Sequence, residues 1–331
     1  MNPKRAKLLP LALLAVVLAI PVFVHVPYYL HICFMIFLFA TMGMGWNLIG
    51  GYGAQLSLGH SVFFAIGAYT SVLFVVYKSL TPLVGGLVGM ALAVVASVII
   101  GLPCFRLLGP YFALATIASG EITRTLLLHF KDFTAGANGV PIPFHGTNPL
   151  FLQFNSKAPY YYLALAMLVV VASIMRLMEK AKIGRYLAAI REDQQAAESL
   201  GVKSSQIKMI AFMLSAAIVA ACGALYAFTV GYIDPDSVAS VNLSIEIAVV
   251  VIVGGIGTLW GPVLGAAVVV LLTELTNMFL GGLRGGANLV LYGTLLIVVI
   301  LLKPEGLISF FNKFRPKQGV DKTQIAHGTH A

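Results

Sequence analysis

The sequence predicts an all-α integral membrane protein, a polytopic bundle of about 8–10 transmembrane helices. Of its 331 residues, 59% are hydrophobic and only 10% are charged, whereas soluble domains carry about 25% charged residues. So few charges cannot cover a water-facing surface of this size. The mean hydropathy of +0.94 also indicates that lipid surrounds most of the exterior.

Ten stretches of the chain come close to the length of about 20 apolar residues that a membrane-spanning helix needs. They are, in chain order, Leu8–Val26, Tyr28–Leu48, Val62–Tyr77, Leu83–Leu102, Tyr111–Leu128, Tyr160–Met178, Met209–Val230, Leu243–Val253, Pro262–Leu280 and Ala287–Leu302. We expect the first to be retained as a helix, because it is longer than the apolar core of a signal peptide. We expect the eighth to continue through its glycines toward Trp260.

The distribution of lysine and arginine predicts the orientation of these helices. With ten crossings and the N-terminus in the cytoplasm, 16 of the 21 cationic residues lie inside. The other five are Lys78, Arg124, Lys131, Lys157 and Arg284. This asymmetry follows the positive-inside rule, so both termini are predicted to be cytoplasmic. It also explains the net charge of +9 without a nucleic-acid partner.

Three segments follow from this count. Residues 1–27 form the N-terminal first helix, residues 28–312 form the main transmembrane domain, and residues 313–331 form a polar tail that we expect to be disordered. Two connections are long. The loop over 130–159 is rich in Gly, Pro and Asn and is predicted outside, while the highly charged loop over 179–208 is predicted inside.

Two glycine clusters interrupt apolar regions in the two halves of the chain. Residues 49–53 read Ile-Gly-Gly-Tyr-Gly, and residues 253–257 read Val-Gly-Gly-Ile-Gly. Paired breaks of this kind can mark unwound helices that line a solute path. Close helix packing through small residues explains them equally well.

Polar residues near these breaks are candidates for a translocation path. Asn47, Gln55, Ser57 and His60 lie in a glycine-rich segment, and broken backbone at membrane depth must line a cavity or be buried in protein. An ordinary cytoplasmic turn between two helices is the alternative.

Carboxylates inside apolar runs are further candidates, because a charge in hydrocarbon costs at least about 2.5 kcal/mol. Glu121 lies one helical turn before Arg124, which predicts an internal ion pair. Ser244 and Glu246 precede an aliphatic run and are candidates for a polar cavity or a contact between subunits. Glu274 is more simply explained by a place near the outer interface.

The inner loop from Gly184 to Val202 is rich in helix formers and bounded by glycines. Ile190, Ala197 and Leu200 can share one face of an amphipathic helix, with the charges around them. Such a helix could dock into a groove on a cytosolic partner, although a solvated connector would also explain the charges. The candidate contact residues are Gly184, Arg185, Ile190, Arg191, Glu192, Gln195, Ala196, Ala197, Leu200 and Gly201.

Sequence motifs for catalysis or nucleotide binding do not occur. The chain has no Walker A sequence, no G-x-S-x-G elbow and no H-E-x-x-H pair. Its three cysteines lie in apolar runs without metal-site spacing. We therefore predict that this chain is not an enzyme and binds no cofactor or metal itself, so any use of ATP belongs to a separate subunit.

Several long segments in a fixed order resemble the branched-chain amino acid type permeases of bacterial ABC importers, of the second-permease type. The resemblance runs from about Trp46 to Ile308. Its matching segments are residues 51–69 (GYGAQLSLGHSVFFAIGAY), 109–116 (GPYFALAT), 184–202, 254–265 (GGIGTLWGPVLG) and 304–306 (PEG).

This resemblance implies a permease of the bacterial inner membrane, embedded in lipid, that imports branched-chain amino acids. Its implied partners are a second related permease, two cytosolic ATPases and a periplasmic solute-binding protein, with alternating access driven by ATP. Gln195-Ala196-Ala197 and Gly201 resemble the Glu-Ala-Ala coupling motif, with Gln195 where that motif has Glu. The same architecture carrying urea or short-chain amides stays open, as does an ion-coupled secondary transporter.

Overall fold

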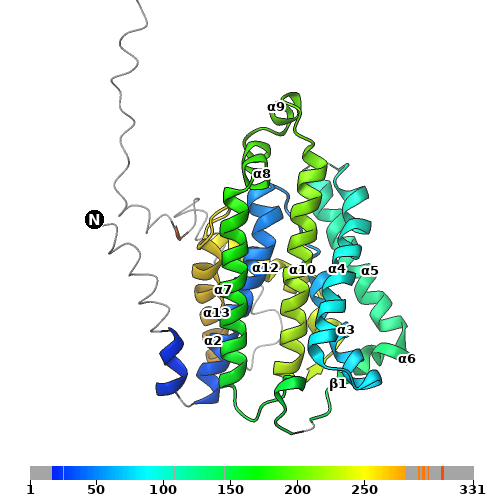
Figure 1. Cartoon of the computed structure of the whole chain (residues 1–331), viewed down its shortest axis with the longest axis vertical. Helices are drawn as coiled ribbons and strands as arrows, with labels where there is room; N and C mark the ends of the chain where they lie inside the picture. The colour runs from blue at the N-terminus through cyan, green and yellow to red at the C-terminus, as the bar shows by residue number, and fades with distance from the viewer. Residues whose placement is uncertain are drawn as a thin grey trace, which may run out of the picture.

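The computed structural model describes residues 17–24, 26–107, 109–144 and 146–280, together with residues 290, 293–294, 297 and 307–308. Within these residues it confirms an all-α architecture (Figure 1). The predicted helices Leu8–Val26 and Ala287–Leu302, and the tail over 313–331, lie largely or wholly outside the described residues. Of the first helix, the structure shows a helical segment over residues 17–23.

Long helices run along the bundle, as expected from the apolar stretches. They are α2 (Pro27–Asn47), α3 (His60–Lys78), α4 (Pro82–Cys104), α5 (Pro110–His129), α7 (Ala158–Lys180), α10 (Ser204–Val230), α12 (Val241–Gly254) and α13 (Gly261–Leu280). Six described spans are long and apolar enough to cross a membrane, namely Pro27–Tyr52, His60–Lys78, Pro82–Cys104, Ala158–Lys180, Ser204–Val230 and Pro235–Gly254. This confirms a multi-pass membrane protein.

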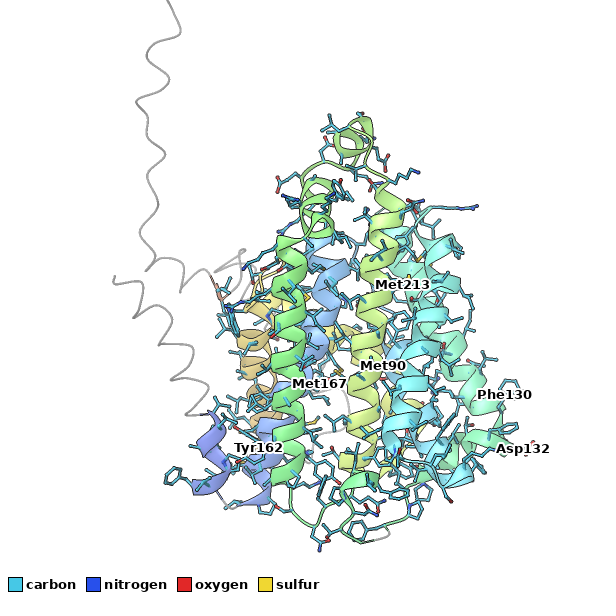
Figure 2. The ribbon with its side chains drawn as sticks, in the orientation of Figure 1. Met90, Phe130, Asp132, Tyr162, Met167 and Met213 are labelled. Atoms are coloured by element: carbon cyan, nitrogen blue, oxygen red, sulfur yellow. The ribbon has the colours of Figure 1, made fainter. Side chains whose placement is uncertain are left out.

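Short elements fill the two ends of the bundle. One end carries α8 (Lys182–Glu192) and α9 (Gln194–Ser199), and we call it the α8 end. The opposite end carries α6 (Lys131–Thr134), 3-10 turns over Gly136–Asn138 and Pro149–Phe151, β1 (Val140–Pro141), β2 (Tyr232–Ile233) and α11 (Pro235–Val238). Figure 2 shows Asp132 and Tyr162 toward this second end.

The structure adds detail to three local expectations and differs from one of them. The eighth helix does not continue toward Trp260, because α12 ends at Gly254 and Gly255 adopts a φ of 130° that a helix cannot contain. The inner loop forms two helices, α8 and α9, which break at the extended Asp193. The long outer loop contains α6, the two 3-10 turns and β1, and β1 pairs antiparallel with β2. Finally, α2 continues as a π-helix over Leu48–Tyr52.

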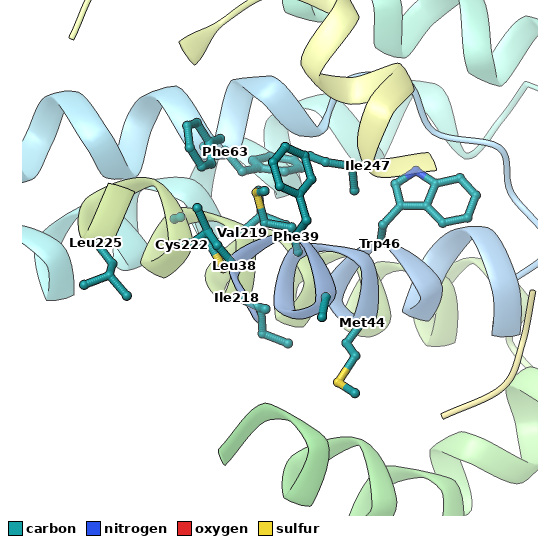
Figure 3. Packing of buried hydrophobic residues seen from close by; sticks show 14 of the residues in the cluster. Leu38, Phe39, Met44, Trp46, Phe63, Ile218, Val219, Cys222, Leu225 and Ile247 are labelled. Atoms are coloured by element: carbon teal, nitrogen blue, oxygen red, sulfur yellow. The ribbon is translucent and has the colours of Figure 1, made fainter. Parts of the chain in front are cut away.

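The core lies where α2, α3, α10 and α12 meet. Figure 3 shows side chains from these helices interleaved, among them Trp46, Phe63, Val219 and Ile247. In the apolar 18-residue stretch of the span that contains α2, 78% of the residues are buried, against 28% in the corresponding stretch of α4. Helix α2 is therefore central, and α4 presents most of its surface outward.

Glycines allow α3 and α10 to approach closely. A Cβ on Gly67 would overlap the carbonyl oxygen of Ala220, and a Cβ on Gly223 would overlap that of Phe64. Small residues at a helix crossing let the two backbones come into van der Waals contact, which is a main source of stability between helices in lipid.

We expect Gly67→Ala to separate α3 from α10 and to destabilise the bundle by about 1–3 kcal/mol, because backbone atoms cannot move aside. The matched control is Gly86→Ala, whose Cβ would meet only the Ala224 Cβ, at an ordinary 3.4 Å. The measurement is the midpoint of unfolding of the purified protein in detergent micelles. Equal midpoints for both variants would contradict the close approach.

Candidate functional site

The segment between the π-helix and α3 contains a buried polar cluster. The two ring nitrogens of His60 contact the Ser57 hydroxyl at 3.1 Å and the Ser215 hydroxyl at 2.8 Å. Trp46, Phe63 and Phe212 surround the imidazole ring. Ser215 lies eleven residues into α10, which is about 16 Å along the helix. The cluster is therefore deep in the bundle.

Side chains satisfy the non-helical backbone of this segment. The Trp46 indole N–H donates to the Ser57 carbonyl at 2.7 Å, and the Leu58 amide donates to the Thr116 hydroxyl at 3.0 Å. The Ser61 amide, at the start of α3, donates to the Ser244 hydroxyl at 2.9 Å. The segment is partly enclosed in protein, because Ser57, Gly59 and His60 are buried while Ala54 and Leu56 are exposed. Both sequence interpretations, a buried break and a cytoplasmic turn, stay open.

The predicted path residues are thus mostly enclosed. Asn47, Ser57, His60 and Ser244 are fully buried, while Gln55 and Glu246 are partly exposed. Asn47 and Ser244 bond to the backbone of other segments, while Ser57 and His60 contact other side chains. A place for them on a solute path stays a prediction.

The two glycine breaks of the sequence lie side by side. Asn47 donates from its side-chain nitrogen to the Thr258 carbonyl at 2.9 Å, and its oxygen accepts from the Gly257 amide at 2.8 Å. A Cβ on Gly51 would lie 2.7 Å from the Gly257 nitrogen. One buried carboxamide therefore joins the end of α2 to residues 255–260, which we call the 255–260 turn.

Three side chains from α7 and α8 contact the same region. The Arg176 guanidinium lies over the Trp260 ring, 5.5 Å from its centroid. The Tyr52 hydroxyl donates to Glu179. The Arg191 guanidinium occupies the space that a Cβ on Gly257 would need. The α8 end of the bundle thus connects α7, α8, the π-helix and the 255–260 turn.

The α8–α9 segment is an ordered element and not a loose connector. A Cβ on Gly184 would overlap the Met178 carbonyl oxygen, so glycine allows the tight turn from α7 into α8. Asp193 caps α9 by accepting from the amides of Gln195 at 2.8 Å and Ala196 at 3.0 Å. Gly201, at a φ of 86°, closes α9 with a Schellman motif.

This segment buries one face and exposes the other. Gly184, Ile190 and Ala197 are buried, whereas Leu200 is 87% exposed. Ile190 and Ala197 therefore do not share a face with Leu200 as expected, because α8 and α9 are separate helices that break at Asp193. The remaining predicted contact residues, Arg185, Arg191, Glu192, Gln195, Ala196 and Gly201, are also exposed.

Helix α5 carries charges on its outer surface. Arg124 pairs with Glu121 at 3.6 Å, as predicted, and more closely with Asp236 of α11 at 2.5 Å. The pair is not internal, because the side chains of Arg124 and Glu121 are 33% and 51% exposed. Lipid would not solvate these groups, so this face needs water or another protein beside it.

Some of these contacts escaped the sequence reasoning. Thr116, Ser215 and Thr258 are single hydroxyls in apolar helices or a glycine turn, and sequence does not reveal their distant partners. Asp236 could have been suspected from the capping pattern Asp234-Pro-Asp-Ser237, which the structure shows as a capping box. Glu274, expected near the outer interface, accepts a hydrogen bond from the Tyr28 hydroxyl at 3.1 Å.

In the part of the chain that the structure describes, no group of three or more His, Cys, Asp or Glu side chains could hold a metal ion. What the site offers is a set of buried backbone connections and an exposed helical segment. These can transmit force between helices and bind a protein partner.

The chain is similar to known transport proteins over most of its length. It is 31% identical to the high-affinity branched-chain amino acid transport system permease protein LivM of Salmonella typhimurium, covering 92% of this chain and 75% of that protein. It is 30% identical to LivM of Escherichia coli, with coverages of 87% and 72%. With the permease protein LivH of Escherichia coli it shares 22% identity, over 82% and 91%.

No solved structure matches the chain significantly. The family described as branched-chain amino acid transport system / permease component matches residues 28–300, which include α2 to α13 and the site described above. The chain therefore belongs to this family of permease components of branched-chain amino acid transport systems.

Proposed function

We propose that this chain is one of two related permease subunits in an ATP-driven importer of branched-chain amino acids. In this assembly two separate cytosolic ATPases supply the energy and a solute-binding protein delivers the amino acid. The family supports the substrate class, and the likeness to both LivM and LivH, two permease proteins of such a system, supports a paired permease. The chain itself binds no nucleotide.

The observation that carries this proposal is the ordered, protruding α8–α9 segment at one end of the bundle (Figure 1). Its buried face, its capped start and its Schellman end fix its shape, and its other face is exposed. A preformed helical surface that presents Leu200 beside charged residues suits docking into a groove on another protein. Because α9 is short, it would move together with a protein that binds it.

The charge distribution supports an orientation with the α8 end in the cytosol. Many cations gather on the segments at that end, namely Arg176, Lys180, Lys182, Arg185, Arg191 and Lys203. The opposite end carries Lys78, Lys131 and Lys157. Positive residues favour the cytosolic side, so this orientation would bring the docking surface to the side where ATPases are found. Cytoplasmic termini remain part of the proposal.

The charged face of α5 is our candidate for the wall of the solute path. Glu121 and Arg124 lie at least partly exposed on α5, which is not among the six apolar spans, and Asp236 of α11 pairs with Arg124 there. A second permease packed opposite this face would enclose a polar passage between the two subunits. ATP-driven movement of α8–α9 would then open that passage alternately to the two sides.

A substitution at Leu200 tests the docking surface. We expect Leu200→Asp to reduce copurification of the ATPases and ATP-dependent leucine uptake at least about tenfold, because it places a charge in an apolar contact. The side chain is 87% exposed, so the fold should be unaffected. Leu200→Met, which keeps the apolar surface, is the matched control and should retain uptake.

The energy source separates this proposal from an ion-coupled transporter. Uptake into vesicles should stop on removal of ATP and continue after the membrane potential is collapsed by an ionophore. The opposite pattern, or full uptake by Leu200→Asp without bound ATPase, would refute an ATP-driven importer. If urea or acetamide inhibited uptake and leucine did not, the substrate class would be urea or short-chain amides and not branched-chain amino acids.

Cysteine labelling tests the α5 face. In a background without the three native cysteines, we expect Glu121→Cys to react with a membrane-impermeant thiol reagent, because water reaches a solute path. Val95→Cys is the matched control, since Val95 is 55% exposed on the apolar helix α4 and should face lipid. Equal protection of both positions would show that this face of α5 does not border a watery path.

A further inference from the structure

Residues 255–260 occupy an unusual position for a turn between two helices. They connect α12 to α13, yet their backbone is fixed by side chains from elsewhere in the chain. Asn47 of α2 binds both the Gly257 amide and the Thr258 carbonyl, and Arg176 of α7 lies over Trp260. The Thr258 hydroxyl also donates to the Gly255 carbonyl at 2.8 Å. A displacement of this turn must therefore involve several helices.

Arg191 is the residue that links the turn to the docking segment. It lies in the last turn of α8, two residues before the break at Asp193 that leads into α9. Its guanidinium fills the space above the Gly257 Cα, where any side chain would collide with it. It is also near enough to interact electrostatically with the Tyr52 hydroxyl at the end of the π-helix.

The connection continues into the centre of the bundle. The Asn47 carboxamide is fully buried and lies at the junction of α2 and the π-helix. A Cβ on Gly51 would overlap its oxygen, so the π-helix wraps closely around it. A π-helical turn has weaker internal hydrogen bonding than an α-helix and often occurs at functional positions, so it is a suitable place for α2 to bend.

We propose that Arg191 is a positioning residue that transmits displacement of α8 to the 255–260 turn and, through Asn47, to the π-helical end of α2. The inference rests on the proposed function in one respect, namely that bound ATPases move α8. Docking takes place through Leu200 and the exposed face of α9, whereas transmission takes place where Arg191 of α8 meets the turn. The two steps therefore depend on different contacts. Because Arg191 is itself exposed, copurification of the ATPases with Arg191→Ala is measured beside the labelling rate.

A thiol at Ile256 can report the movement, because this side chain is 40% exposed within the turn. The parent for the test is Ile256→Cys without the native cysteines, in lipid vesicles with its ATPase partners. The measurement is the rate of labelling by a fluorescent maleimide, with and without ATP plus vanadate. We expect nucleotide trapping to change this rate in the parent.

Three variants interrupt the connection at different points. Arg191→Ala removes the guanidinium, Asn47→Ala removes both hydrogen bonds to the turn, and Gly257→Ala displaces the guanidinium. Gly257 has a φ of 71°, which also strains an alanine, so the result for Gly257→Ala counts only together with that for Arg191→Ala. We expect the nucleotide-dependent change to fall about tenfold in each variant, within the usual range of coupling between sites.

Controls separate transmission from docking and from folding. Lys182→Ala removes another exposed cation of α8 and should keep the full nucleotide response. Asn47 is buried and cannot touch an ATPase, so its variant should still copurify with the ATPases. If Asn47→Ala fails to fold, Gly257→Ala on the partly exposed turn, taken together with Arg191→Ala, provides the same test. Combining Arg191→Ala with Gly257→Ala should be no worse than either alone.

The possible results distinguish the two proposals. Transmission through Arg191 is supported if the ATPases bind and hydrolyse ATP in every case, and the labelling rate changes with nucleotide in the parent and in Lys182→Ala. In the three variants this change should be largely lost. An equal response in Arg191→Ala, or no response in the parent despite bound and active ATPases, would overturn the transmission alone. Failure of any ATPase to bind the parent would overturn both proposals.

Discussion

Lipid offers no hydrogen-bond partner to a peptide group, and this chain nevertheless contains two non-helical segments inside its helical bundle. Residues 53–59 and the 255–260 turn would each leave amides and carbonyls unsatisfied, at a cost of roughly 2–7 kcal/mol for each group. Asn47 resolves part of this problem for the 255–260 turn, because a single carboxamide can donate and accept together. Trp46 and Thr116 do the same for the Ser57 carbonyl and the Leu58 amide. The packing of α2, α3, α12 and α13 around this point depends on that arrangement.

The same constraint explains why polar residues are buried here without forming an open path. Ser57, His60 and Ser215 pair with one another, and Ser244 and Thr116 accept from backbone amides. Each hydroxyl or ring nitrogen replaces a water molecule that the membrane interior lacks. Their first function is to allow the backbone to leave the helical conformation at this depth. Helices that are joined by such contacts can move as units when one of them is displaced.

Much of the architecture could be predicted from sequence because apolar length is a local property. The long helices begin and end within a few residues of the apolar stretches, apart from α10, which starts five residues earlier than expected. The glycine breaks were also visible, although their contact with each other was not, since Asn47 and Gly257 are 210 residues apart. Distant pairs of this kind leave no periodic pattern in the sequence.

At the site, too, local features could be predicted from the sequence and tertiary contacts could not. The buried Ile190 and Ala197 follow from amphipathic spacing, but the exposure of Leu200 depends on the extended backbone of Asp193, a single-residue break that helix propensity does not reveal. Arg124 was assigned a partner one turn away, and the structure adds a closer one on α11. Its side chain could reach Asp236 only because α11 packs against α5, which is a tertiary contact.

The composition of α5 has a consequence for how the protein is made. Glu121 and Arg124 raise the free energy of inserting α5 into the bilayer by several kcal/mol. As an isolated segment, α5 would therefore insert poorly from the translocon into lipid. Its neighbour α4 is the most hydrophobic of the six apolar spans and is joined to it by a short connection. The two helices should therefore partition into the bilayer as a hairpin, so that biogenesis of the charged helix depends on the one synthesised just before it.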